Sequence, residues 1–202
     1  MGYNPAELRD AVGRWTTGGS SAGLRTSGSY SGPLRSEVSS ILGSTHPLLV
    51  RGNMGVAIHN SAKDYDPRAP EKAIAAYEPS VDTLHVFANG MSRLTALQKN
   101  IDVHHELFHR LDFDAGRRGR SIRSADLRSA DLGYRRALAH DMGSMSVDDK
   151  RKVSYVTSPM ESYAEILARM GLPPEAGDRV LQVFPRSRAW LERHIVDLGL
   201  RR

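Results

Sequence analysis

Two histidines and a glutamate lie close together in His105-Glu106-Leu107-Phe108-His109, which follows the HExxH pattern. On a helix, residues four positions apart lie one above the other, so both imidazoles can bind one metal ion from a single face. Glu106 projects about 100° away from His105, where it can contact a water without completing the ligand set. With 8 His in 202 residues, this pattern is expected by chance in roughly 1% of such chains. The residue types therefore predict a metal site with a general base beside it.

The ligand chemistry of such a site is restricted by the composition, because the chain contains no Cys. Structural zinc sites rely on Cys, so a site built from His and carboxylates favours catalytic zinc, with three protein ligands and an open fourth position. The metzincin pattern requires Gly at position 112 and His or Asp at position 115. The chain has Asp112 and Ala115 instead, which excludes that class.

A third ligand is offered by the segment "ESYAE", in which Glu161 and Glu165 are four positions apart. On a helix both carboxylates share one face with small alanines, which lets this helix approach the HExxH helix closely. Either carboxylate could supply the third ligand. His140 or Asp141 in "LAHDM" is an alternative third ligand.

Two further polar residues flank the motif. His104 falls on the apolar stripe of the expected helix, where a hydrogen-bonded core residue is more common than a ligand. Asp112 lies one turn beyond His109, either as a partner of a ligand imidazole or in a surface ion pair with an Arg.

The elements that must position these residues are two amphipathic helices. One is expected over 92–113, from apolar residues with helical spacing: Leu94, Leu97, Ile101, Phe108 and Leu111. The other is expected over 158–171, with Ser158 as N-cap, Pro159 at the first position, Glu161 as capping-box partner and Gly171 as its end.

Around them the patterns predict helices over 36–43, 70–79, 130–142 and 185–200, and strands over 54–60 and 82–90. The fold class is therefore α+β and zincin-like, a small mixed sheet packed against the HExxH helix and the glutamate-bearing helix. The strand over 83–89 is expected to bind an extended peptide by edge pairing.

The chain is expected to divide into a flexible leader over 1–35 and a folded domain over 36–202, because residues 16–32 are rich in Gly, Ser and Thr. Within the leader, "RDAVGRWTTGG" resembles a "RDxxGRWTxGG" segment of phage minor head proteins. This short resemblance implies a phage-related setting.

The net charge of +5 would suit an acidic partner, but the basic residues lie in loops and at the C-terminus without interleaved aromatic residues. This distribution favours charge that keeps the protein in solution over a nucleic-acid-binding patch. The N-terminus lacks a signal-peptide core and no apolar run reaches membrane-spanning length. The expected location is the cytoplasm or a virion.

The segments "HHELFHRLD", "YVTSPMESYAEILARM" and "FPRSRAWLERHIV" together resemble the catalytic domain of the anthrax lethal factor type of zinc metallopeptidase. The resemblance covers about residues 84–197. It implies that His105, His109 and Glu161 bind zinc, so that Glu165, one turn beyond Glu161, is placed to orient a ligand imidazole through its second N–H, and that Glu106 is the general base. It also implies that Tyr155 faces the zinc, although Tyr155 lies one residue closer to the ligand glutamate than in the family.

The sequence thus predicts a zinc-dependent endopeptidase that acts on protein or peptide substrates, with phage-particle or toxin-delivery proteins as further partners. Two other classes remain open. One is a catalytically silent capsid-associated protein that retains the zincin fold, and the other is a basic nucleic-acid-binding module.

Overall fold

The computed structural model describes residues 25–27, 30, 32–52, 54–114, 127–156, 158–171 and 178–195. The chain forms two compact units, one of residues 15–110 and one of residues 1–14 and 111–202, and each is described by itself below. Most of the expected leader, 1–35, lies outside the described residues. Its described part includes strand β1 (Arg25–Ser27) and the start of helix α1 (Leu34–Gly43), so regular structure begins before residue 36.

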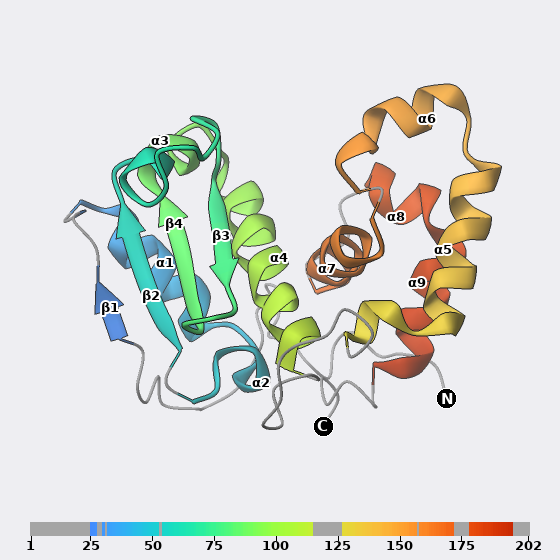
Figure 1. Cartoon of the computed structure of the whole chain (residues 1–202), viewed down its shortest axis with the longest axis horizontal. Coiled ribbons are helices and arrows are strands. Elements are labelled where there is room, and N and C mark those ends of the chain that lie inside the picture. Colours follow the sequence, from blue (N-terminus) through green and yellow to red (C-terminus); the bar gives the residue numbers. More distant parts are fainter. Residues whose placement is uncertain are drawn as a thin grey trace. The chain divides into compact units, whose positions relative to one another are not determined.

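The first unit contains a four-stranded mixed sheet with the strand order β1-β2-β4-β3 (Figure 1). Strand β2 (Gly55–His59) pairs in parallel with β1 and β4 (Thr83–Phe87), and β3 (Ala75–Glu78) pairs antiparallel with β4. The register places Val56 beside Leu84, and both side chains are at most 1% exposed. Since side chains alternate between faces along a strand, this face forms the core and the face with His59 and His85 is the opposite one.

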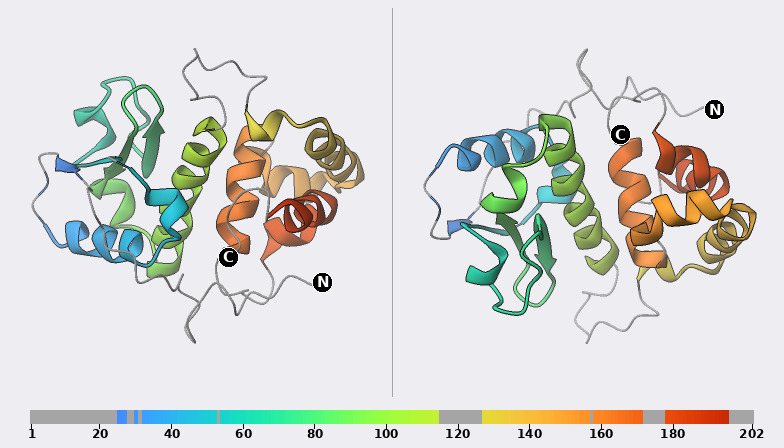
Figure 2. Two further views of the ribbon diagram at one scale, coloured as in Figure 1. Left: turned by 90° about the horizontal axis from the view of Figure 1, so that it is seen from below. Right: turned by 90° about the horizontal axis from the view of Figure 1, so that it is seen from above.

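Among its described residues, this unit also contains the 3-10 helix η2 (Ala62–Asp64) and four α-helices: α1 (Leu34–Gly43), α2 (Pro47–Val50), α3 (Ala88–Met91) and α4 (Ala96–Asp114). Helix α4 carries the HExxH motif, and its last four residues belong to the second unit. In Figure 2, α1 and the first turns of α4 lie on the same side of the sheet. The expected α+β class, the strands over 54–60 and 82–90 and the long HExxH helix are confirmed.

The helix expected over 70–79 is wrong, because residues 75–78 form β3. Three alanines in "AIAAYEP" suit a helix, but Glu78 precedes Pro79, and a residue before proline is biased toward extended backbone. Pairing with β4 and the burial of Tyr77, 9% exposed, favour the strand. Pairing with β4 therefore outweighs the helix propensity of these residues.

The second unit is helical among its described residues. Its α-helices are α5 (Leu132–Ser144), α6 (Val147–Lys152), α7 (Pro159–Met170), α8 (Arg179–Val183) and α9 (Pro185–His194). Short 3-10 helices η4 (Arg128–Ala130) and η5 (Ser154–Val156) connect them. Helices α5 and α9 run side by side (Figures 1 and 2). The expected helices over 36–43, 130–142, 158–171 and 185–200 correspond to α1, α5, α7 and α9.

The core of the second unit is built around two fully buried tyrosines. The rings of Tyr134 on α5 and Tyr163 on α7 meet edge to face, 5.6 Å between centroids, a favourable aromatic geometry. The hydroxyl of Tyr134 lies 2.9 Å from Ser162 Oγ, which satisfies its polar end. These contacts fix α7 against α5. Among the helices that the structure describes, none combines the length and apolar character needed to cross a bilayer.

Candidate metal centre

The two histidines of the motif converge on α4. The Nε2 atoms of His105 and His109 lie 2.9 Å apart, and the two rings are nearly perpendicular, at 83°. Two zinc–nitrogen bonds of about 2.0–2.1 Å at a tetrahedral angle would place the nitrogens about 3.3 Å apart. The pair therefore fits one metal ion after a small outward shift of either ring.

A carboxylate on α7 completes a group of three. Ser158 caps this helix by accepting the backbone N–H of Glu161 at 3.1 Å. One ligand atom each of His105, His109 and Glu161 lies within 4.8 Å of the other two. Within the described part of the chain, no other group of three His or acidic residues meets this criterion. The donor set of two imidazoles and one carboxylate suits a divalent metal such as zinc.

The carboxylate of Glu106 contacts strand β3 of the sheet. Its Oε2 atom accepts the backbone N–H of Tyr77 on β3 at 2.8 Å, and the side chain is half-buried. The other oxygen, Oε1, has no hydrogen-bond partner among the described residues. One carboxylate oxygen is therefore anchored, and the second can accept a proton.

The strand expected to pair with a peptide, over residues 83–89, is not at an edge. It corresponds to β4, which lies between β2 and β3 with both sides paired, so that expectation is wrong. The edge strand on this side of the sheet is β3. It is also the strand that Glu106 contacts.

Tyr155 and Glu165 contact each other in the second unit. The Tyr155 hydroxyl, on η5, donates to Glu165 Oε1 at 3.3 Å, and Arg169 Nε donates to the same oxygen at 2.8 Å. Partial burial of the hydroxyl, together with the charge of Glu165, raises the pKa of Tyr155 to about 12. The hydroxyl therefore stays a proton donor at neutral pH. These contacts do not test the roles expected for Tyr155 beside the metal and for Glu165 beside an imidazole.

His104 is a hydrogen-bonded core residue, as expected. It is 2% exposed, with Nδ1 2.9 Å from the Asn100 carbonyl and Nε2 3.1 Å from Thr45 Oγ1. Asp112 is 1% exposed, so it is not part of a surface ion pair. It accepts hydrogen bonds from the Ser129 amide at 2.8 Å and the Ser129 hydroxyl at 2.6 Å.

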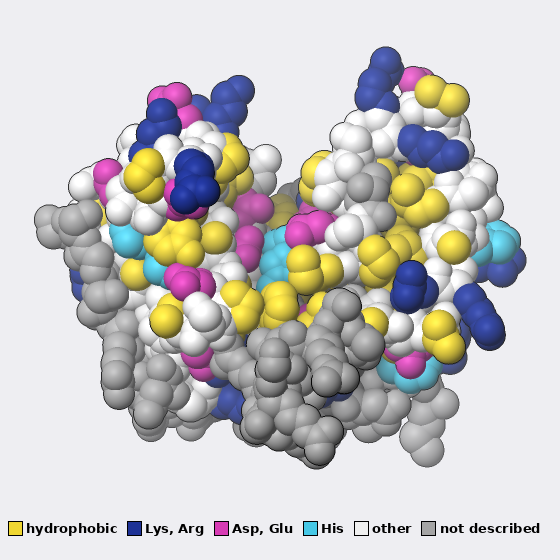
Figure 3. Space-filling view, viewed as in Figure 1, with side chains coloured by type: hydrophobic (Ala, Val, Ile, Leu, Met, Phe, Trp, Pro, Cys, Tyr) yellow, Lys and Arg dark blue, Asp and Glu magenta, His cyan; other side chains and the backbone are white. Residues whose placement is uncertain are grey.

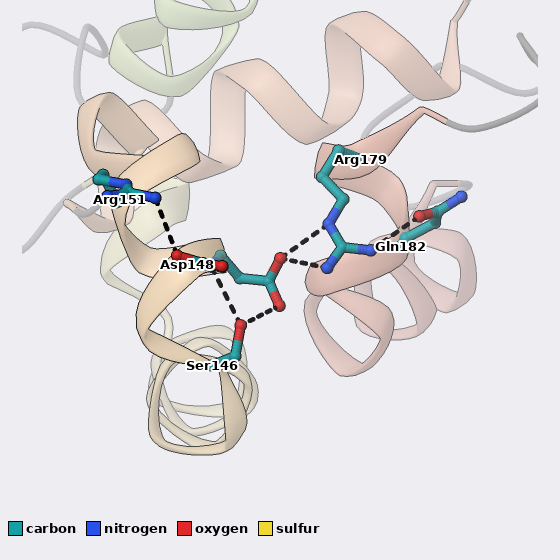
Figure 4. A network of polar contacts seen from close by, with 6 residues as sticks. Ser146, Asp148, Arg151, Arg179 and Gln182 are labelled. Carbon is teal, nitrogen blue, oxygen red and sulfur yellow. Dashed lines mark hydrogen bonds and ion pairs between the residues drawn. The ribbon is translucent and has the colours of Figure 1, made fainter.

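The alternative third ligands, His140 and Asp141, line a separate open pocket of about 290 Å³ among α5, α6, α8 and the start of α9. Asp141 is buried and accepts the Ser187 amide and hydroxyl, both at 2.8 Å, at the start of α9. On the pocket wall Arg179 pairs with Asp149 (Figure 4). Neither His140 nor Asp141 belongs to the group of three, so Asp141 is a helix-capping residue.

Sequence reasoning missed the amide of Tyr77 as a partner of Glu106. The two residues are 29 positions apart, and no local pattern links them. Pro79 and Ser80 between two β-rich runs were an available signal for the β3–β4 hairpin. No protein-family model and no curated protein sequence matches this chain. Of the expected resemblance, the structure shows the small mixed sheet and the cluster of His105, His109 and Glu161.

Proposed function

We infer that the chain is a zinc-dependent endopeptidase, with His105, His109 and Glu161 as the metal ligands. The observation that carries this inference is the convergence of these three side chains, with ligand atoms within 4.8 Å of one another. Two imidazoles and one carboxylate leave a fourth position open, which is the arrangement of catalytic zinc sites. When bound, zinc lowers the pKa of a water and polarises a carbonyl.

Glu106 is the general base in this proposal. Its carboxylate is held through Oε2 by the Tyr77 amide at 2.8 Å, which supports a fixed orientation of Oε1. Oε1 takes the proton of the attacking water, and the same carboxyl group then delivers it to the leaving amine. An anchored carboxylate loses less freedom in this step than a solvated one.

Tyr155 is the candidate donor to the oxyanion of the tetrahedral intermediate. Its raised pKa, about 12, supports this role because the hydroxyl keeps its proton at neutral pH. To donate to substrate, the hydroxyl must leave Glu165 Oε1, a contact of 3.3 Å. Glu165 stays paired with Arg169, 2.7 Å away, when the hydroxyl turns.

The substrate class is a protein or peptide bound in extended form. Strand β3 is an edge strand whose Tyr77 amide binds Glu106, so an extended peptide that reaches the general base would lie beside this edge without pairing at Tyr77. The segment over 9–19 that resembles phage minor head proteins supports a phage-particle or toxin-related setting.

The competing classes receive less support. A catalytically silent scaffold has no need for three converging metal ligands such as His105, His109 and Glu161. A nucleic-acid-binding surface requires gathered positive charge. Over the described surface in Figure 3, Lys and Arg side chains are scattered and not gathered into one patch.

Two glutamine variants test the proposal. Glu106→Gln keeps the shape of the side chain but removes the proton acceptor, so the variant should fold and bind zinc. Peptide hydrolysis should fall by about 10²–10⁴-fold, the usual effect of losing a general base. Glu161→Gln should lose zinc affinity together with activity. Zinc content by elemental analysis and cleavage of casein measure the two properties.

The matched control is Glu192→Gln on α9. It changes a carboxylate that pairs with Arg188 and should retain zinc near wild-type stoichiometry. Undiminished casein cleavage by zinc-loaded Glu106→Gln would contradict the mechanism. Equal zinc content in Glu161→Gln and wild type would contradict the ligand set.

A further inference from the structure

Arg110, which follows His109, is buried, and each of its three side-chain nitrogens donates a hydrogen bond. It is 6% exposed, and its Nε and Nη2 atoms donate to the two carboxylate oxygens of Asp82 at 2.7 and 3.0 Å. Nη1 and Nη2 also donate to the carbonyls of Leu49 and Arg51 at 3.1 and 2.8 Å. A bidentate guanidinium–carboxylate pair of this kind has a well-defined geometry.

Asp82 lies in the turn that joins β3 to β4. Its backbone has a positive φ of 51°, a conformation that Asp and Asn tolerate better than most residues. Besides Arg110, its Oδ1 atom accepts the hydroxyl of Tyr77 at 2.7 Å. The carboxylate of Asp82 therefore ties the turn to α4 and to the side chain of β3 at once.

Tyr77 closes the connection back to α4. Its hydroxyl binds Asp82, and its backbone N–H binds Oε2 of Glu106. Glu106 and Arg110 are four positions apart and so share one face of the helix. The hairpin is thus fastened to α4 at two points one turn apart, and the path Arg110–Asp82–Tyr77–Glu106 begins and ends on the helix.

We propose that Asp82 is a positioning residue for Glu106: by fixing Tyr77 it holds the β3 amide that orients the carboxylate of the general base. The catalytic meaning of this assignment rests on the proposed peptidase function. The hydrogen bond itself does not, because all four residues belong to the first unit and none is a metal ligand.

The hydrogen-exchange rate of the Tyr77 amide distinguishes a positioning role of Asp82 from a purely structural one. Since its N–H points to Glu106, the neighbouring amides of Ala76 and Glu78 point to β4 by strand alternation. Loosening of the whole strand would speed hydrogen exchange at all three amides. Loss of the positioning contact would speed exchange at Tyr77 alone.

The experiment compares amide exchange by NMR in the metal-free full chain. Asp82→Asn keeps a residue suited to positive φ and removes the charge. Tyr77→Phe removes only the hydroxyl, and serves if Asp82→Asn fails to fold. Glu106→Ala gives the exchange rate of the Tyr77 amide when its acceptor is absent. Ser80→Ala is the matched control, because it removes a hydrogen bond to Glu78 in the same hairpin.

We expect Asp82→Asn and Tyr77→Phe to speed exchange at Tyr77 by about tenfold, as for loss of one charge-assisted hydrogen bond, toward the rate in Glu106→Ala. Ala76 and Glu78 should change little, and Ser80→Ala should leave all three rates unaltered. Unchanged exchange at Tyr77 in both variants, or equal acceleration at all three amides, would overturn the proposal. Neither result depends on peptide cleavage. The proposed function is tested separately, by the zinc content and casein cleavage of the glutamine variants.

Discussion

At the residue scale, His104 and His105 are neighbours in the chain with opposite environments. His104 is 2% exposed and hydrogen-bonded to Asn100 and Thr45, whereas His105 Nε2 lies 2.9 Å from His109 Nε2. We predict that His104→Ala lowers the free energy of unfolding by about 2–4 kcal/mol, through a cavity and unpaired polar partners. His105→Ala should instead abolish zinc binding.

The two variants are compared by urea denaturation of the metal-free proteins and by zinc titration of the folded ones. His104→Ala should still bind close to one zinc per chain below its unfolding midpoint. If His104→Ala lost zinc while retaining wild-type stability, the assignment of the two histidines would have to be exchanged.

The individual residues of the site could be predicted from the sequence where helical spacing alone decides their positions. The i, i+4 relation of His105 and His109 and the buried place of His104 follow from 3.6 residues per turn. The contacts of Glu106 and Asp112 could not be predicted, because their partners, Tyr77 and Ser129, lie on other elements.

At the element scale, α7 depends on its first turn. The Ser158 hydroxyl accepts the amide of Glu161 at 3.1 Å, and Pro159 occupies the first helical position. We predict that Ser158→Ala lowers the free energy of unfolding by about 1 kcal/mol, the usual effect of losing an N-cap. Ser158→Thr should retain most of the stability, because Thr also caps helices. Thermal unfolding followed by circular dichroism measures the stability of both variants. Equal loss of stability in Ser158→Ala and Ser158→Thr would show that the loss does not come from the missing cap.

The helices were more predictable than the sheet for a physical reason. Helices α4 and α7 carry their own signals, a periodic apolar face and a cap, within a dozen or so residues. Strand β3 has four residues, and its identity depends on pairing with β4. The division of the chain into two units also had no local signal, because the boundary falls within α4.

At the scale of the whole molecule, two histidines on the sheet face opposite the core should make stability depend on pH. His59 Nε2 lies 3.0 Å from His85 Nδ1, and His85 Nε2 lies 3.2 Å from Glu78 Oε2. Burial lowers the pKa of both histidines, and the charge of His59 lowers that of His85 further. Asp64 and Glu78 partly oppose these shifts.

Since the folded pKa values are below the usual value of about 6.5, the unfolded chain binds more protons between the two values. The contribution of these two histidines to the free energy of unfolding should therefore be fully present above about pH 6.5. It should be lost as the pH falls below that value. Urea denaturation of the metal-free protein between pH 7.5 and 5 measures the slope. His85→Gln should flatten it, whereas His140→Gln, at an exposed histidine, should not. An unchanged slope in His85→Gln would contradict the prediction.

The hydrogen bond between Glu106 and Tyr77 has a consequence for solubility. An unpaired strand at the rim of a sheet is a template onto which further copies of a protein can stack, and proteins protect such rims with charges or covering helices. Here a helix places a carboxylate on the backbone of β3, and Pro79 ends the strand after four residues. Any added strand would have to bury that charge. The group proposed to handle the proton in catalysis thus also acts as a gatekeeper against self-assembly.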